Sequence, residues 1–209
     1  MSTSPVETYT ISYCATTQRL YLSGSFLNYW NEFRGELTRL IFRKTDGYER
    51  KSAEELAEPR TISLVMTNCP GGKIDDLFAL CGLLKLFKRE MPHLKFTLHC
   101  CGLNSSCATG FLCCDVFETV TTDEFATFLI HESATTCFSN MASVPRKRLA
   151  AVIDILDQGE EMLVGLYTKA AERRSKESQN WKEIMQNGND KRYLNGAQMV
   201  EYGLIDQVL

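Results

Sequence analysis

At 209 residues, with 44% hydrophobic and 23% charged side chains, the chain has the length and composition of one ordinary globular domain. Its formal net charge of −3 gives no general attraction to nucleic acid or to an anionic membrane surface. No apolar run approaches the roughly 20 residues that span a bilayer, and the first residues lack the basic and apolar regions of a secretory signal. We therefore expect a soluble intracellular protein.

The nine cysteines have neither the spacing of a metal site nor that of a disulfide framework. No C-x-x-C pair occurs, and the adjacent cysteine doublets lie in apolar runs, where cysteine behaves as a small hydrophobic residue. We expect buried free thiols in a reducing compartment and no metal, with a zinc site as the alternative.

The first part of the chain predicts a polar arm followed by strands and a helix. Residues 1–18 are rich in Thr and Ser and are expected to form an extended or mobile arm before a single domain at residues 19–209. Alternation predicts a strand at residues 19–26, and helical spacing predicts an amphipathic helix at residues 29–43. Residues 44–59 are charged and turn-rich, which indicates a surface excursion before an apolar strand at residues 61–68.

The middle of the chain repeats a strand–helix–strand order. A helix over residues 74–89 has acidic residues in its first turn and basic residues in its last, which favours the helix dipole. A buried strand is expected at residues 94–101, then a short helix from Ser106, then a strand that ends at His131. This order predicts an α/β fold with parallel strands joined by crossover helices.

The last part of the chain is helical. Residues 144–178 predict one long, highly charged helix, and we expect part of it to meet another subunit because one small sheet cannot cover it. Short helices are expected at residues 180–186 and 196–202, with Gly203 as a C-cap and a closing strand or tail at residues 204–209.

Ser106 lies in the stretch CGLNSSCATGFL (residues 101–112), where small residues allow a sharp turn between a strand and a helix. A hydroxyl at that turn is followed by backbone N–H groups at a helix N-terminus, which favour a developing negative charge. The alternative is that Ser105 or Ser106 serves only as a helix N-cap.

Two further segments complete the parts of an acyl-transfer site. The glycines of NCPGGKI (residues 68–74) let a backbone N–H face open space, and His131 follows Ser106 by 25 residues. Acyl transfer needs a nucleophile, a base and two oxyanion donors, which Ser106, His131 and the N–H groups of Gly72 and Cys107 can supply. A plain Pro-Gly-Gly turn and a structural histidine are the alternatives.

These motifs, in this order, resemble the ClpP family of Clp serine peptidases. The resemblance rests first on three motifs: N-x-P-G-G, then G-x-x-x-S with a following F-L, then I-H at 25 residues beyond the serine. In addition, YLN (193–195) and VEYGLID (200–206) are similar to the closing segment of that family. The resemblance covers about residues 19–209. It implies the crotonase-like α/β superhelix of β-β-α units, with a protruding handle helix over about residues 144–178.

The resemblance implies that Ser106 is the nucleophile, His131 the general base, and Gly72 and Cys107 the oxyanion donors, with no cofactor in this chain. The third member of the site departs from the family, because the register places its aspartate at Asn187, with Asp190 as the alternative. An asparagine can orient the imidazole through its carbonyl oxygen, but it cannot stabilise the imidazolium by charge.

The implied partners are further copies or homologues of the chain in heptameric rings stacked as a tetradecamer, an AAA+ Clp unfoldase that uses ATP, and unfolded polypeptides. The implied compartment is the cytoplasm, or alternatively the plastid stroma. Residues 44–60 and 170–177 are longer than in the family, Ser105-Ser106-Cys107 replaces Ala-Ser-Met, and Glu132 replaces a glutamine, which indicates a divergent member. The alternative functions are a weak or inactive ring subunit, an acyl-CoA enzyme of the crotonase fold, and a phage capsid-maturation protease.

Overall fold

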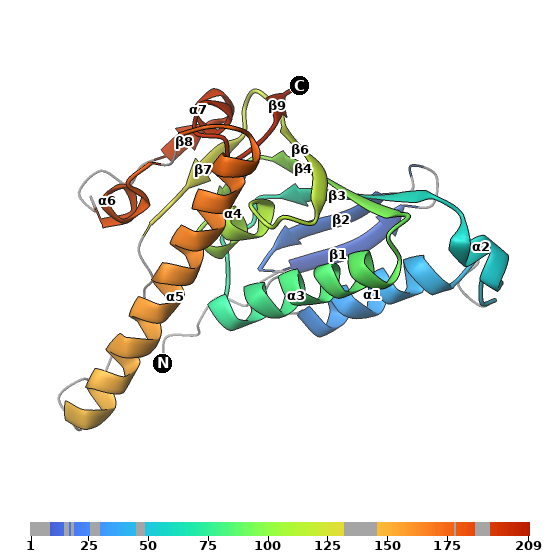
Figure 1. Ribbon diagram of the computed structural model, residues 1–209, viewed down its shortest axis with the longest axis horizontal. Helices are drawn as coiled ribbons and strands as arrows, with labels where there is room; N and C mark the ends of the chain where they lie inside the picture. The colour runs from blue at the N-terminus through green and yellow to red at the C-terminus, as the bar shows by residue number, and fades with distance from the viewer. Residues whose placement is uncertain are drawn as a thin grey trace, which may run out of the picture.

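A six-stranded sheet forms the centre of the computed structural model (Figure 1), which describes residues 9–14, 17, 19–25, 30–44, 49–131, 146–177, 179–186 and 193–209. The strand order is β1 (Tyr9–Cys14), β2 (Arg19–Gly24), β3 (Arg60–Thr67), β4 (Leu94–Cys101), β6 (Phe117–Thr122) and β9 (Gln207–Val208). Neighbouring strands from β2 to β9 pair in parallel, and β1 pairs antiparallel with β2. The mixed α/β fold with parallel pairing is therefore confirmed.

The arm expected at residues 1–18 is, between Tyr9 and Cys14, a paired edge strand of this sheet. Tyr9, Ile11 and Tyr13 pack against the core, and the register places Ile11 opposite the fully buried Leu22. A strand was not predicted here, because the segment is rich in Thr and Ser and the alternation of these three apolar side chains is short.

Two helices cover one face of the large sheet (Figure 1). Helix α1 (Trp30–Phe42) buries Phe33, Leu37 and Ile41 at four-residue spacing, and α3 (Ile74–Glu90) lies beside it with its own buried stripe. The expected surface excursion contains a short helix that was not predicted, α2 (Ala53–Ala57), whose start is fixed by a capping box between Ser52 and Glu55.

A second, small sheet consists of three strands of three residues each, in the order β5 (Leu103–Ser105), β7 (Thr127–Leu129) and β8 (Tyr193–Asn195). Strand β5 pairs in parallel with β7, and β7 pairs antiparallel with β8. The prediction of one strand ending at His131 is wrong, because β6 belongs to the large sheet and β7 ends at Leu129. The break is a turn in which the Asp123 carboxylate accepts a hydrogen bond from the Phe125 N–H at 3.0 Å.

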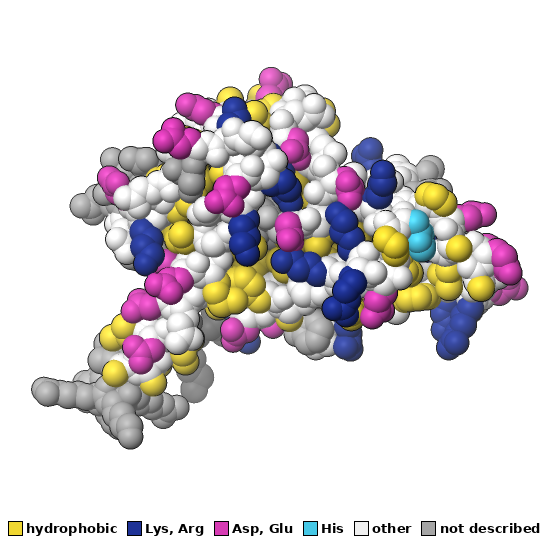
Figure 2. Space-filling model, viewed as in Figure 1, with side chains coloured by type: hydrophobic (Ala, Val, Ile, Leu, Met, Phe, Trp, Pro, Cys, Tyr) yellow, Lys and Arg dark blue, Asp and Glu magenta, His cyan; other side chains and the backbone are white. Residues whose placement is uncertain are grey.

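The expected long helix is α5 (Arg146–Arg173), which spans 28 residues. Its C-terminal part packs on the short helix α4 (Cys107–Leu112), and its N-terminal part extends away from the sheets (Figure 1). Hydrophobic and acidic side chains lie together on this extension (Figure 2), where Ile153, Ile155 and Met162 are exposed. No helix within the described ranges is both long and apolar enough to cross a membrane.

The C-terminal segment closes both sheets. It contains α6 (Trp181–Gln186), the unpredicted strand β8, and α7 (Gly196–Glu201), after which Gly203 has a φ of +73° as expected of a helix stop. Asp206 ties this segment to the large sheet, because its carboxylate accepts hydrogen bonds from the Val120 N–H at 2.6 Å and from the Arg174 guanidinium at 2.6 and 3.0 Å.

The cysteines agree with the expectation of free thiols. No disulfide bond joins the cysteines within the described residues. All of these cysteines except Cys14 and Cys101 are buried. Cys137 lies outside the described residues.

Candidate active site

Ser106 sits on a strained turn between β5 and α4. Its backbone has φ +58° and ψ −130°, a conformation that costs an L-residue about 1–3 kcal/mol. Although Ser106 occupies the N-cap position of α4, its side chain makes no capping hydrogen bond, so the N-cap alternative is not supported for this residue. The backbone therefore holds this half-buried residue at the junction, and its hydroxyl does not cap the helix.

The small sheet brings Ser106 and His131 to neighbouring strand ends. Ser105 pairs with Leu129, and the Ser106 N–H donates a hydrogen bond to the Leu129 carbonyl at 2.9 Å. His131 follows Leu129 by two residues and is half-buried. Because β5 and β7 are parallel, the serine and the histidine leave the sheet at the same end.

The glycine loop after β3 packs directly against Ser106. Gly71 has a φ of +100°, and a Cβ added to it would lie 2.7 Å from the Ser106 Cβ and 3.1 Å from the Cys107 nitrogen. Any larger residue at position 71 must therefore displace the turn that holds Ser106. The sequence indicated Gly72 as the oxyanion donor, but the packing of Gly71 against Ser106 was not predicted. The first glycine of such a pair is a natural place for a positive φ.

Two asparagines fasten this loop to β5, and both were missed from the sequence. The Asn68 side-chain oxygen accepts a hydrogen bond from the Leu103 N–H at 3.0 Å, and that of Asn104 accepts one from the Cys69 N–H at 3.4 Å. The Cys69 carbonyl in turn accepts from the Ser105 N–H at 2.9 Å. Asn104 is fully buried, and both the oxygen and the nitrogen of its side-chain amide form hydrogen bonds to backbone groups.

The Cys107 thiol lies close to the backbone groups proposed as oxyanion donors. Burial raises the pKa of the Cys107 thiol to about 11, and hydrogen bonds from the Ser106 hydroxyl and from the Gly72 and Cys107 N–H groups oppose that rise.

Helix α4 is held rigidly behind the serine. All six of its residues are buried, and a Cβ on Gly110 would lie 2.7 Å from a Leu163 methyl group and 2.9 Å from a Leu77 methyl group. The Thr109 hydroxyl lies 2.6 Å from the Ser106 carbonyl and 2.7 Å from the hydroxyl of the fully buried Tyr167. The turn is thus packed between α3 and α5, so a shift of Ser106 would disturb the core.

Asn187 and Asp190, the candidates for the third member, lie outside the described residues. The elements on either side of them are placed. Helix α6 ends at Gln186, and β8 begins at Tyr193, which pairs with Leu129 near the end of β7. The chain therefore returns to the strand that leads to His131.

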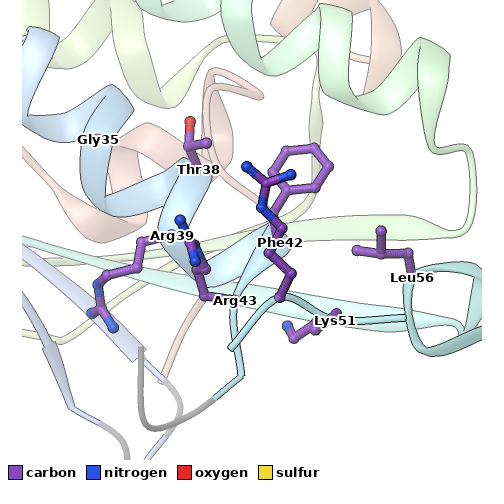
Figure 3. Close-up of a pocket in the computed structure, with 8 residues that line it drawn as sticks. Gly35, Thr38, Arg39, Phe42, Arg43, Lys51 and Leu56 are labelled. Carbon is purple, nitrogen blue, oxygen red and sulfur yellow. The ribbon is translucent and has the colours of Figure 1, made fainter. Parts of the chain in front are cut away.

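An open pocket of about 810 Å³ lies between α1 and the segment around α2, away from the predicted site residues (Figure 3). Arg39, Arg43, Arg50 and Lys51 line it. The Lys51 ammonium donates to the Leu40 carbonyl at 2.8 Å, and Arg39 pairs with Glu36 at 2.8 Å. These positive side chains therefore stabilise the C-terminal end of α1, where positive charge is favourable.

Comparison with known families agrees with this geometry. A family model described as Clp protease matches residues 52–209, well over half of the chain, and this range includes Gly71, Ser106 and His131. No curated protein matches the chain.

Proposed function

Because the chain belongs to the Clp protease family, we propose that it is the proteolytic subunit of an ATP-dependent Clp protease. It acts as a serine endopeptidase that hydrolyses peptide bonds of unfolded proteins inside a chamber of two stacked rings. The observation that supports this function most is the strained backbone of Ser106, with Gly71 packed against it and the end of β7 beside it.

In the proposed reaction, His131 takes the proton of the Ser106 hydroxyl while the oxygen attacks the scissile carbonyl. The Gly72 and Cys107 N–H groups donate hydrogen bonds to the resulting oxyanion. His131 then gives its proton to the departing amine, and an acyl ester remains on Ser106. A water molecule, deprotonated by His131, attacks the ester, releases the acid and restores the serine.

Asn187 is the proposed third member, with Asp190 as the alternative. An asparagine there accepts the ring N–H of His131 and orients the ring, but it leaves the imidazolium without a countercharge. In a serine protease the corresponding loss of the aspartate charge lowers turnover by about 10⁴. The proposed enzyme is therefore slow unless Asp190 or a partner subunit supplies the charge.

The proposed assembly is a tetradecamer of two heptameric rings, homomeric or mixed, served by an AAA+ unfoldase that hydrolyses ATP. The exposed apolar side chains of the α5 extension, including Ile155 at 60% exposure, support a ring-to-ring contact because single subunits seldom expose several large apolar side chains together. The chain itself needs no cofactor in this proposal, and the proposed compartment is the cytoplasm, or alternatively the plastid stroma.

A second candidate function is a ring subunit with little or no activity of its own. The feature that favours it is Asn187, which stands where the family register places an aspartate and cannot supply its negative charge.

Single-turnover labelling with a fluorophosphonate tests the two functions. We expect the native chain to be labelled slowly, Ser106→Ala and His131→Ala to show no labelling, and Asn187→Asp to react faster. Labelling that appears only in Asn187→Asp would support the inactive subunit. An absence of labelling in the native chain and in Asn187→Asp, with folding intact, would contradict the peptidase proposal for the chain on its own.

A further inference from the structure

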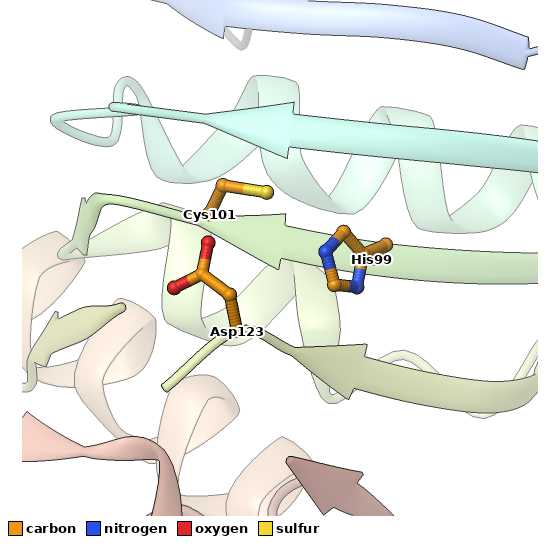
Figure 4. Close-up of side chains that lie close together, drawn as sticks. All are labelled: His99, Cys101 and Asp123. Carbon is orange, nitrogen blue, oxygen red and sulfur yellow. The ribbon is translucent and has the colours of Figure 1, made fainter. Parts of the chain in front are cut away.

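Three side chains with metal-binding atoms gather near the carboxyl ends of β4 and β6. They are His99, Cys101 and Asp123, whose ligand atoms all lie within 4.8 Å of one another and which are each half-buried. Figure 4 shows Cys101 and Asp123 side by side, with the sulfur of Cys101 directed toward His99. His99 and Cys101 are two residues apart on β4, so they project from the same face of the sheet.

A neighbouring hydroxyl already orients the imidazole. The Nδ1 atom of His99 lies 2.8 Å from the Thr121 Oγ1 on β6. A ring N–H at Nδ1 that donates to this hydroxyl leaves the Nε2 lone pair free for a metal ion. Histidines that bind metals usually have such a partner on the other ring nitrogen, because it fixes the tautomer and the ring orientation.

The other two side chains lie next to each other. The Cys101 sulfur and a carboxylate oxygen of Asp123 lie within 4.8 Å of each other, and the Asp123 N–H donates a hydrogen bond to the Cys100 carbonyl at 3.3 Å. A cation that replaces the thiol proton would therefore meet a sulfur atom and a carboxylate oxygen held together by the same strand ends.

We propose that His99, Cys101 and Asp123 bind a divalent cation of the Zn²⁺ class. One sulfur, one imidazole nitrogen and one carboxylate oxygen form a donor set that zinc accepts and that Mg²⁺ and Ca²⁺ do not prefer. The thiolate and the carboxylate together balance the two positive charges of the ion. Bonds of about 2.0–2.3 Å require the ligand atoms to approach by roughly 1 Å, which side-chain rotation can supply.

An open pocket adjoins the histidine of this cluster. His99 and Thr121 line an open pocket of about 380 Å³ on this face of the sheet. Arg19 lines the same pocket, so both anionic ligands are needed to hold a cation beside it. The bound ion would tie β4 to the turn after β6, and thus to the segment that leads into the Ser106 turn.

Cobalt binding tests the site because Co²⁺ reports thiolate ligation by a sulfur-to-metal charge-transfer band. The full chain is stripped of metal, kept reduced with a phosphine, and titrated with Co²⁺ and then with Zn²⁺. We expect one equivalent of Co²⁺ to bind with this band, Zn²⁺ to displace it, and Mg²⁺ or Ca²⁺ to leave it unchanged. Cys101→Ser should remove the band, whereas Cys14→Ser, which changes the other half-buried cysteine, should keep it.

Thr121→Val provides a second test that keeps all three ligands and the β-branched shape of the strand residue. Because it removes only the partner of Nδ1, we expect Zn²⁺ affinity to fall by about 10-fold. The proposal is overturned if the native chain binds no stoichiometric Co²⁺, or if a folded Cys101→Ser variant keeps the full band. Equal Zn²⁺ affinity in Thr121→Val and the native chain would overturn the assigned role of the His99 ring.

Discussion

The large and the small sheet of this molecule differ in how their strands are held. Strands β3 and β4 pair along eight residues each and carry many of the buried apolar side chains, such as Leu64, Met66, Phe96 and Leu98. The strands of the small sheet have three residues each and depend on loop contacts such as those of Asn68 and Asn104. The large sheet therefore provides stability, and the small sheet brings Ser106 and the strand that leads to His131 together.

If this comparison is correct, substitutions beside the small sheet change labelling more than stability, and substitutions that loosen the large sheet do the reverse. The largest effect is expected for Ser106→Ala, since it removes the proposed nucleophile. We expect fluorophosphonate labelling to fall by about 10⁴-fold or more, with little change in the unfolding temperature. Ser105→Ala is the matched control, and it should stay within about 10-fold of the native rate because Ser105 pairs through its backbone.

Gly71→Ala should have the next largest effect. The new methyl group would lie 2.7 Å from the Ser106 Cβ and 2.8 Å from the Ser105 carbonyl, so it must push the turn out of place. We expect labelling to fall by about 10²–10³-fold, the cost of losing an oxyanion donor, together with a loss of about 1–3 kcal/mol in the free energy of unfolding.

Gly82→Ala is the control for this substitution. Gly82 lies in α3 with no atom within 4 Å of an added Cβ, so alanine there should raise the free energy of unfolding by about 0.5–1 kcal/mol and leave labelling unchanged. A normal labelling rate in a folded Gly71→Ala variant would show that the loop contact does not position Ser106.

Asp206→Asn tests the large sheet. Burial alone would raise the pKa of Asp206. The hydrogen bonds from Arg174 and from the Val120 N–H, together with the positive charge of Arg174, outweigh burial, so the pKa is lowered. We expect the variant to lose about 2 kcal/mol of stability at pH 7 and to keep most of its labelling. A carboxyl whose pKa is lowered on folding contributes stability above its unfolded value of about 3.9 and loses it as the pH falls.

Denaturant titrations of native chain and Asp206→Asn between pH 7 and pH 3 check this sign. The difference in stability should be largest near neutrality and should shrink below about pH 4. A difference that grows as the pH falls would contradict the assignment.

Thr109→Val should have a smaller effect than Asp206→Asn, and Thr109 lies between the two regions. It removes the hydroxyl shared by the Ser106 carbonyl and the buried Tyr167, so we expect a loss of about 1–2 kcal/mol in denaturant unfolding. Tyr167→Phe should cost less, about 1 kcal/mol, because Thr109 keeps its other partner. An equal or larger cost for Tyr167→Phe would show that the contact with the tyrosine hydroxyl, and not the hydrogen bond to the Ser106 carbonyl, accounts for the loss in Thr109→Val.

The sequence predicts strands β2, β3 and β4 of the large sheet and the helices α1 and α3 well, because these elements are long and periodic, whereas β1 and β6 were not predicted. Strand β4 has the predicted bounds, and α3 extends the prediction by one residue, since alternation and helical spacing act over many positions. Strands β5, β7 and β8 were missed or misplaced, because three residues carry no usable period. Their pairing depends on contacts between segments far apart in the chain, such as Leu129 with Tyr193.

The candidate site shows the same division. Ser106 and His131 could be selected from residue type and order, and the proposal still rests on them. The packing of Gly71 against Ser106 and the hydrogen bonds of Asn68 and Asn104 were not predicted, because they form only when the loop after β3 packs against β5. The cluster of His99, Cys101 and Asp123 was also missed, since it forms only when β6 lies beside β4 and its spacing matches no metal motif.

The parallel register of β5 and β7 has a consequence for the newly made chain. Ser106 and His131 reach neighbouring strand ends only after Ser105 pairs with Leu129, and β7 is covered only when β8 arrives from the C-terminal segment. Strand β8 is the last of these three strands to leave the ribosome, about 64 residues after β7. The small sheet is therefore completed only when synthesis of the chain is nearly finished.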